Sequence, residues 1–253
     1  MVTITFCTQK GGVSKTTTAE ALILYLRRHG YKVLAIDLDN QGNLSTYFNY
    51  DPNQKKTVFE FVDGDGDPKE AIVNDLLAGG SRLRYLVSYF DQNELSAFGN
   101  ALKAAKLDYD VVVIDTPPAI NRVVLAALAA SDYLIMPTEP SPDSLAGVKE
   151  TLKAVDAVLI KDNPNLKVLG TLLVKYKDHY KLHKQFKTAL ESSKTIPMFK
   201  TCIRESQGIN AAKIKHADFY SKDYSHVNAV VDYREFCKEV IEKIGLKPKE
   251  EKK

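Results

Sequence analysis

Short apolar runs recur along the chain and alternate with segments of helical periodicity, which limits the fold more than any other feature of the sequence. The runs are rich in Val, Ile and Leu, as expected of strands that are buried on both faces of a parallel sheet. The predicted strands are 2–8, 33–37, 111–115, 133–137 and 166–174, and the predicted helices include 15–29, 145–159 and 227–244. We therefore expect a single α/β domain, in which helices cover both faces of a mostly parallel, twisted sheet.

Length and composition are those of an ordinary globular protein. The 253 residues suffice for one large domain, and the 44% hydrophobic and 26% charged residues are typical values. No apolar run reaches the roughly 20 residues that a membrane-spanning helix needs. Cys7, Cys202 and Cys237 lie far apart in the sequence, which excludes a disulfide framework and favours a reducing compartment. We therefore expect a cytoplasmic protein.

Positive charge is concentrated in one part of the chain. Residues 175–222 contain eleven Lys and Arg residues against four acids, a net charge of +7, whereas the whole chain carries only +3. Such an asymmetry favours a polyanionic partner and fits nonspecific contact with DNA phosphates. The alternative is a lysine-rich face that is merely solvated.

The strongest single signal is the segment 9–17, QKGGVSKTT, which lies between the first predicted strand and the first predicted helix. Backbone N–H groups of such a turn point inward, its glycines allow close approach, and the helix N-terminus adds partial positive charge, so the turn favours phosphate. In a P-loop, Lys15 would reach the β- and γ-phosphates and the Thr16 hydroxyl would ligate Mg²⁺. Gln9 and Ser14 stand where the general P-loop pattern has glycine, so a simple glycine-rich turn is the alternative.

Acidic residues end two of the predicted strands. Asp37 and Asp39 are two residues apart at the end of the second strand, and Asp115 ends the third. In extended chain, side chains two apart point the same way, and ligands of open α/β sheets bind at the carboxyl edge. An apolar strand that ends in an acid is also the Walker B arrangement of a magnesium site. Each acid alone could cap a helix, but together with the glycine-rich turn they favour a nucleotide–magnesium site.

Three segments together resemble one known family. The segments 10–17 (KGGVSKTT), 37–43 (DLDNQGN) and 114–118 (IDTPP) are similar to the motifs of the deviant Walker A ATPases, above all those of the ParA/Soj group that segregates plasmids and chromosomes. The resemblance runs over residues 1–245, which implies one P-loop ATPase domain followed by a charged tail at 246–253. It implies ATP and Mg²⁺ as cofactors, ATP hydrolysis to ADP and phosphate, and a homodimer that sandwiches two ATP molecules.

The resemblance assigns catalytic roles to three residues. Lys10 matches the signature lysine of the family, which crosses to the partner's nucleotide, so that dimerisation depends on ATP rather than ADP. Lys15 binds phosphate in the same loop, and Asp39 positions the attacking water. The implied ATP-binding residues of the loop are Lys10, Gly11, Gly12, Val13, Ser14, Lys15, Thr16 and Thr17.

Further assignments by resemblance concern the metal and the γ-phosphate. Asp37 supports the magnesium shell, and Asp115 holds Mg²⁺ through water. The implied metal site comprises Thr16, Asp37 and Asp115, and the implied γ-phosphate-sensing switch comprises Thr116, Pro117 and Pro118. The sequence departs from the family at Ser14, where most members carry Gly, and at Asn40, where Pro is usual. The serine does not by itself imply a loss of activity.

A loop near the end of the last strand contacts adenine in the family and binds DNA through a neighbouring arginine. The best match in this chain makes Ile203 and Glu205 the adenine neighbours and Arg204 the DNA contact, with Lys213 and Lys215 as secondary DNA contacts. The resemblance implies that the ATP-bound dimer binds double-stranded DNA without sequence preference. A ParB-like partner would then stimulate hydrolysis, and the protein would lie on the nucleoid.

Other functions of the same fold are alternatives. A MinD-like regulator that cycles on and off membranes needs an amphipathic C-terminal anchor. The apolar residues there look instead like core contacts of a last helix, so we expect no membrane association; they are Phe236, Val240, Ile241 and Ile244. A bacterial tyrosine kinase would carry a C-terminal tyrosine cluster, whereas Tyr220, Tyr224 and Tyr233 are scattered. A noncatalytic interaction protein is the last alternative.

Two further patterns resemble metal sites but lack essential ligands. His179 and His183 are four residues apart, yet no general-base Glu and no third ligand accompanies them. The acidic segment 63–67 begins like a calcium loop, but Pro68 and Asn74 stand where that loop requires Gly and Glu. We interpret this segment as an exposed turn.

Overall fold

The protein is described by a computed structural model that covers residues 1–50, 56–63, 67–80, 82–92, 94–193, 195–247 and 249. Residues 64–66 of the acidic segment and Lys194 of the basic segment lie outside these ranges. The strands are β1 (Val2–Phe6), β2 (Val33–Asp37), β3 (Ile72–Val73), β4 (Leu76–Leu77), β5 (Val111–Asp115), β6 (Tyr133–Thr138), β7 (Lys167–Tyr176) and β8 (Met198–Arg204). The helices are α1 (Lys15–Arg28), α2 (Asn43–Tyr47), α3 (Val58–Asp63), α4 (Leu83–Gln92), α5 (Ser96–Ala104), α6 (Arg122–Ala129), α7 (Pro142–Lys161), α8 (Lys181–Glu191), α9 (Gln207–Ile214) and α10 (Asn228–Ile244), with a 3-10 helix η1 (Pro68–Ala71).

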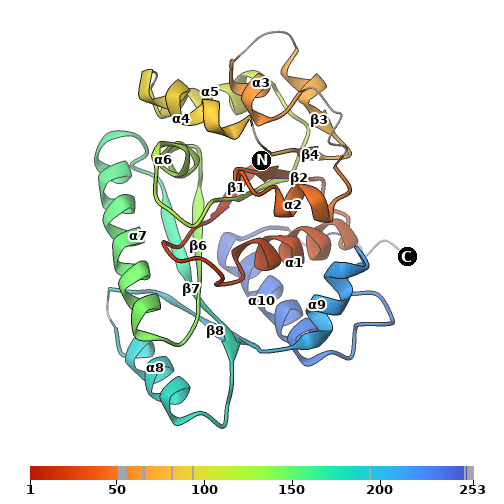
Figure 1. Ribbon diagram of the computed structural model, residues 1–253, viewed down its shortest axis with the longest axis vertical. Coiled ribbons are helices and arrows are strands. Elements are labelled where there is room, and N and C mark those ends of the chain that lie inside the picture. The colour runs from red at the N-terminus through yellow and green to blue at the C-terminus, as the bar shows by residue number, and fades with distance from the viewer. Residues whose placement is uncertain are drawn as a thin grey trace.

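The described strands form one sheet in the order β3-β4-β2-β5-β1-β6-β7-β8 (Figure 1). Every neighbouring pair is parallel except β3 and β4, which are antiparallel. β5 and β6 follow each other in the chain but lie on opposite sides of β1, so the strand order reverses there. In open α/β sheets, ligands bind outside the carboxyl ends of the strands at such a point. The predicted α/β fold with a mostly parallel sheet is confirmed.

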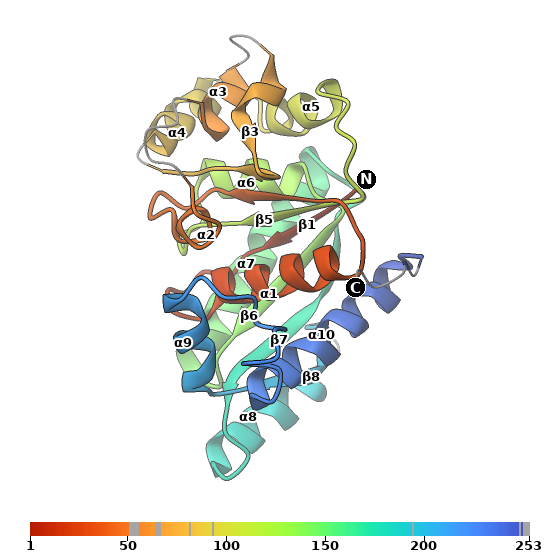
Figure 2. The same ribbon diagram turned by 90° about the vertical axis from the view of Figure 1, so that its right-hand side faces the viewer.

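Alternate side chains of the strands enter different cores. In β2, Val33 and Ala35 pack with α1 and α10, whereas Leu34 and Ile36 pack with α3, α4, α5 and α6 on the other face. Strands β6 and β7 also pack against α7 and α8. Figure 1 shows α6, α7 and α8 on one side of the sheet and α1, α9 and α10 on the other, and in Figure 2 the second group faces the viewer. Burial on both faces explains why the strand sequences are continuously apolar.

All five predicted strands are present, and their ends differ from the prediction by at most two residues. Helix α1 ends at Arg28, and Gly30 follows in the left-handed conformation (φ 77°), as a helix stop requires. The sequence pattern did not reveal β8. This strand lies at the edge of the sheet, so buried and exposed residues are mixed along it; Phe199 is buried and Lys200 is exposed. An edge strand of this kind lacks the continuous apolar run on which the prediction relied.

Helix α10 uses the apolar residues near the C-terminal end as core contacts. Phe236 and Val240 are fully buried, and Ile241 and Ile244 pack against the same core. Gly245 ends the helix in the left-handed conformation (φ 66°). The interpretation of these side chains as core contacts is confirmed. Within the described ranges, we find no helix with both the length and the apolar character needed to cross a bilayer.

Candidate functional site

The loop between β1 and α1 has the backbone shape of a phosphate cradle. Gly12 and Ser14 both adopt the left-handed conformation, with φ of 77° and 57°. Glycine adopts it freely, whereas the Cβ of Ser14 costs about 1–2 kcal/mol there. Among the hydrogen bonds of the described chain, none is donated by the N–H groups of residues 11–14. These donors are therefore available to an anion.

Lys15 lies in the first turn of α1 and lines an open cavity of about 410 Å³. The residue is only 7% exposed, and its ammonium donates to the backbone carbonyls of Lys10 (3.0 Å) and Thr8 (3.4 Å). Burial lowers the pKa of Lys15, although Asp115 opposes this. A buried ammonium that is bonded only to neutral carbonyls is poorly compensated, and a phosphate in the cavity would supply the missing negative charge.

Asp37 and Asp115 lie side by side at the carboxyl ends of β2 and β5 and are fully buried. Both oxygens of Asp37 accept hydrogen bonds from the chain: Oδ1 from the Asp39 N–H (3.0 Å), and Oδ2 from the N–H (2.8 Å) and hydroxyl (2.7 Å) of Ser45. Asp115 Oδ2 accepts from the Thr16 hydroxyl (2.7 Å), but its Oδ1 has no partner among the described residues. Asp37 thus anchors the start of α2, and Asp115 keeps one oxygen free.

The electrostatics of these two carboxyls suit a divalent cation. Burial raises the pKa of Asp37 to about 6, and burial together with the Asp37 carboxyl raises the pKa of Asp115 well above its usual value. A cation beside Asp115 Oδ1 and the Thr16 hydroxyl would offset this cost with oxygen ligands of the kind that Mg²⁺ prefers. The described residues hold no cluster of three or more His, Cys, Asp or Glu side chains arranged for a metal. Mg²⁺ commonly uses one or two carboxylates together with substrate phosphates, so Thr16 and Asp115 fit such an ion.

Asp39 lines the same cavity as Lys15. Its Oδ1 accepts from the Gln41 N–H (3.0 Å), and the residue is 7% exposed. Gly79, after β4, lies so close that a Cβ there would be 2.8 Å from the Asp37 carbonyl oxygen and 3.0 Å from that of Asp39. The position of Asp39 therefore depends on a glycine that the sequence analysis did not single out.

The predicted switch residues follow β5 directly. The Thr116 hydroxyl donates to the Phe6 carbonyl (2.7 Å), which ties this segment to the end of β1. Pro118 lines the cavity beside the loop. The structure thus brings the 114–118 motif to the loop; its switching role stays a prediction.

The Lys10 side chain contacts the start of α7 and does not line the loop cavity. Its ammonium donates to the hydroxyls of Ser141 and Ser144, at 2.9 Å each. Ser141 is the N-cap of α7. Sequence analysis did not find these two serines, because they lie more than 130 residues from Lys10.

Gly147, in α7, allows this helix to pack against the loop. A Cβ at Gly147 would lie 2.6 Å from the Gln9 carbonyl oxygen. Replacing a helical glycine with alanine normally stabilises a helix by about 0.5–1 kcal/mol. For Gly147→Ala we expect the opposite, a loss of about 1–3 kcal/mol in the free energy of unfolding, because the clash is with backbone.

Chemical denaturation of Gly147→Ala and of a matched control, Gly99→Ala in α5, checks this expectation. A Cβ at Gly99 would meet Ala130 at 3.4 Å, an ordinary contact, so the control should be neutral or stabilising. A Gly147→Ala protein as stable as the control would show that α7 does not constrain the loop.

A second cavity, of about 230 Å³, adjoins the first and contains the predicted adenine neighbours. Ile203 and Glu205 line it, together with Ser14 and Thr17 of the loop. Glu205 is also paired with Lys177 (2.6 Å). The structure therefore places the end of β8 beside the phosphate cradle, as adenine binding at this position requires.

The three predicted DNA contacts lie in different surroundings. The Arg204 guanidinium makes two bonds to Asp232, from Nε (2.9 Å) and from a terminal nitrogen (2.7 Å). Lys213 faces the loop cavity. Lys215, at the end of α9, is exposed and makes no ion pair within the described ranges.

Lys175 is a cavity residue that the sequence analysis missed. It is the last residue but one of β7 and adopts a left-handed conformation (φ 52°). Its ammonium lies 2.8 Å from the Gly12 carbonyl oxygen and 2.6 Å from a Glu139 carboxylate oxygen. It lines both cavities. Only the approach of β7 to the loop brings it there, and no local pattern in the sequence marks it.

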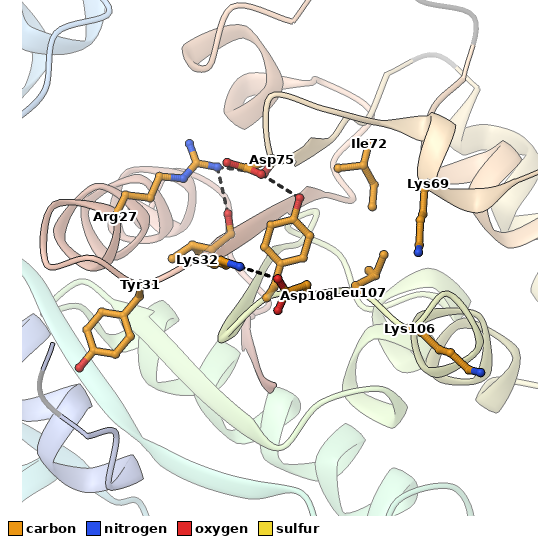
Figure 3. A pocket seen from close by; sticks show the side chains of 11 residues that line it. Arg27, Tyr31, Lys32, Lys69, Ile72, Asp75, Lys106, Leu107 and Asp108 are labelled. Atoms are coloured by element: carbon orange, nitrogen blue, oxygen red, sulfur yellow. Dashed lines mark hydrogen bonds and ion pairs between the residues drawn. The ribbon is translucent and has the colours of Figure 1, made fainter.

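A larger cavity, of about 700 Å³, lies at the amino end of β2, away from the loop (Figure 3). Several of its polar groups bind one another or nearby carbonyls. Arg27 donates to the carbonyls of Val33 (3.1 Å) and Asp75 (2.9 Å), and Lys32 pairs with Asp108. This cavity gathers none of the predicted site residues, so the loop cavity is the candidate site.

Known proteins resemble the chain in both sequence and fold. Residues 1–168 match the family described as AAA domain. The chain is 33% identical to the chromosome-partitioning ATPase Soj of Thermus thermophilus over 192 residues, which are 75% of either chain. It is 30% identical to the chromosome partitioning protein ParA of Caulobacter vibrioides in an alignment of 188 positions that covers 70% of each chain.

A solved structure extends the likeness to the whole fold. Cobyrinic acid a,c-diamide synthase from Mycobacterium smegmatis, with bound ADP and magnesium, superimposes with a TM-score of 0.83 at 25% identity. The match covers all of this chain and 99% of that one. The resemblance to ParA and Soj that the three motifs indicated is confirmed. With its glycine-rich loop at the reversal point of the sheet, the chain belongs to the AAA-domain family that includes the ParA and Soj partitioning ATPases.

Proposed function

We propose that this chain is a Mg²⁺-dependent ATPase of the ParA type, whose ATP-bound dimer binds DNA and is reset by hydrolysis. One observation carries the proposal: a single cavity receives Lys15, Asp39 and the Thr16 hydroxyl, and Asp115 keeps a buried oxygen free beside it. This set combines a phosphate cradle, a metal site and a carboxylate that can orient water. The ADP and magnesium in the Mycobacterium smegmatis structure support the same ligands for this chain.

The residues at the cavity have different roles in the proposed reaction. The N–H groups of residues 11–14 and the Lys15 ammonium bind and orient the phosphates. Thr16 and Asp115 hold Mg²⁺, which neutralises charge on the phosphate oxygens. Asp39 accepts a hydrogen bond from the attacking water and keeps it in line with the γ-phosphate. Pro118, on the cavity wall, senses whether the γ-phosphate is present.

Dimerisation in this proposal uses Lys10. In the single chain its ammonium lies against two serine hydroxyls at the N-terminus of α7, where the helix dipole disfavours a cation. Breaking the two hydrogen bonds between the Lys10 ammonium and the serine hydroxyls therefore costs little free energy. The phosphates of the partner's nucleotide are charged and are stronger acceptors. ATP would thus draw Lys10 across the interface.

DNA binding in this proposal uses the exposed part of the basic segment. Lys215 is free of ion pairs within the described ranges, whereas Arg204 shares its charge with Asp232. Other exposed lysines of the segment that form no ion pair with described residues are Lys181, Lys184, Lys200 and Lys222. A ParB-like partner stimulates hydrolysis and so releases the protein from the nucleoid. The proposed ATPase domain is residues 1–245, and the proposed location is the cytoplasm.

Nucleotide-dependent sizing, with and without random-sequence DNA, tests the proposal. With ATP and Mg²⁺ we expect a doubled mass and retardation of DNA at low salt, and with ADP neither. Because Lys215 would neutralise a DNA phosphate, Lys215→Gln should reduce the slope of log K against log salt by about 1. The dimer should form as in the wild type.

Failure to dimerise and to retard DNA would contradict the ParA assignment. ATP-dependent sedimentation with anionic liposomes, in place of DNA binding, would favour a MinD-like membrane cycle. The burial of Phe236 and Val240 in the core argues against that outcome.

A further inference from the structure

A buried carboxylate lies in the helix that follows the loop. Glu20 is in α1, five residues after Lys15, and is 0% exposed. One of its oxygens, Oε2, lies 2.9 Å from the Lys213 ammonium. Neither Oε1 nor Oε2 makes a hydrogen bond of normal geometry to a described residue, so the contact with Lys213 is an ion pair without a well-formed hydrogen bond. The mechanism proposed above does not use Glu20.

Lys213 brings the partner charge from α9. Its ammonium also donates to the Thr17 hydroxyl (3.1 Å), the last residue of the loop motif. Thr17 lines both the phosphate cavity and the adenine cavity, and Lys213 lines the phosphate cavity. The ammonium therefore lies beside the residue at which the two cavities meet, and its side chain is 27% exposed.

This ion pair contributes little to stability by itself. Taking a carboxylate fully out of water costs several kcal/mol, and the attraction of its partner roughly offsets that cost. Burial raises the pKa of Glu20 to about 7 even with Lys213 beside it, which shows how incompletely the pair compensates. An apolar pair of similar size would fill the same space at least as well. What the pair does achieve is to hold an ammonium at a defined place beside Thr17.

We infer that Lys213 contacts the phosphates of the bound nucleotide and that Glu20 is the positioning residue that holds it there. The inference rests on the proposed nucleotide site and assigns Lys213 to that site instead of to DNA. A bound diphosphate would give the ammonium a second, charged acceptor in the place where it now donates to the neutral Thr17 hydroxyl, and charge-assisted hydrogen bonds to phosphate oxygens are the stronger kind. Because Lys213 belongs to α9, which begins two residues after Glu205, the same side chain links this helix to the start of α1.

The test separates binding from folding. Isothermal titration with ADP and Mg²⁺ measures affinity without turnover, and thermal unfolding of the same samples without nucleotide measures stability. Lys213→Met leaves Glu20 buried without its cation, so we expect lower stability as well as about 10- to 100-fold weaker ADP binding. The double variant Glu20→Gln/Lys213→Met removes both charges, so its stability should return to that of the wild type while its ADP affinity stays about 10- to 100-fold lower.

The control is a surface pair of the same chemistry. Lys153 and Glu150 lie 2.7 Å apart on α7, outside both cavities, and Glu150→Gln/Lys153→Met should change neither ADP affinity nor stability measurably. A Glu20→Gln/Lys213→Met protein that regains both stability and ADP affinity would show that the pair is only structural and would overturn the inference. Wild-type protein that does not bind ADP and Mg²⁺ at all would instead overturn the proposed function.

Discussion

Replacing Asp39 with asparagine is expected to lower the rate of ATP hydrolysis by about 10²- to 10⁴-fold while leaving the fold intact. The amide keeps the shape of the side chain, and its oxygen can still accept the hydrogen bond from the Gln41 N–H. With that oxygen held by Gln41, the amide turns an NH2 donor toward the water in place of a carboxylate oxygen, so the attacking water loses the acceptor that orients it. Phosphate release under single-turnover conditions measures the effect, and unfolding curves verify the fold.

The neighbouring acid supplies the contrast. Asp37→Asn places an amide nitrogen against the N–H and hydroxyl donors of Ser45 or the N–H of Asp39. One buried donor then lacks an acceptor, which should lower the free energy of unfolding by about 1–3 kcal/mol. If Asp39→Asn hydrolyses ATP at the wild-type rate, Asp39 does not act on the attacking water and the proposed division of roles is wrong.

Replacing Lys15 with methionine is expected to remove almost all nucleotide binding. Methionine fills a similar volume, so the cavity wall is kept, but the buried ammonium no longer meets the phosphates. At a ligand concentration of 100 times the dissociation constant, nucleotide stabilises the wild type by about 2.7 kcal/mol, a rise in Tm of roughly 5–10 °C for a chain of this size. A loss of about 100-fold in affinity reduces that rise to roughly 1–2 °C.

Thermal unfolding with ADP and Mg²⁺ measures this effect, and Lys10→Met is the comparison. The Lys10 ammonium lies on Ser141 and Ser144 rather than in the cavity. Its removal should therefore preserve most of the ADP-induced rise while abolishing ATP-dependent dimerisation. An undiminished rise in Lys15→Met would mean that the phosphates do not bind at this loop.

Local features of the sequence predicted which residues the structure brings together at the loop. The loop at 9–17 and the motif at 114–118 are continuous in sequence, and the acids end strands whose apolar character is visible in the residues themselves. The parallel sheet then brings the carboxyl ends of β1, β2 and β5 to one edge, because parallel strands end on the same side. For these residues, the positions of the strands in the sequence were enough to predict that their side chains lie near one another.

Two residues that looked equivalent in sequence were distinguished only by packing. Asp37 and Asp39 are both strand-end acids. The N–H and hydroxyl of Ser45 donate hydrogen bonds to Asp37, whereas Asp39 lines the cavity. Similarly, Lys213 belongs to a basic segment that favoured DNA, but the fold turns it toward Thr17. Charge counted along a chain does not reveal the direction in which each side chain points.

The sequence by itself therefore determined the fold class, the glycine-rich loop and the strand-end acids near it, since each is a pattern of residues that are close together in the chain. Tertiary structure alone decided what surrounds them. Two serines bind Lys10, Gly147 lets α7 approach the loop, Gly79 lets the segment after β4 approach Asp39, and Glu20 pairs with Lys213. These contacts join elements far apart in the chain, such as Lys213 and Thr17, which are 196 residues apart. They form only when the helices and strands pack against one another, and the local periodicity of the sequence does not show which elements will meet.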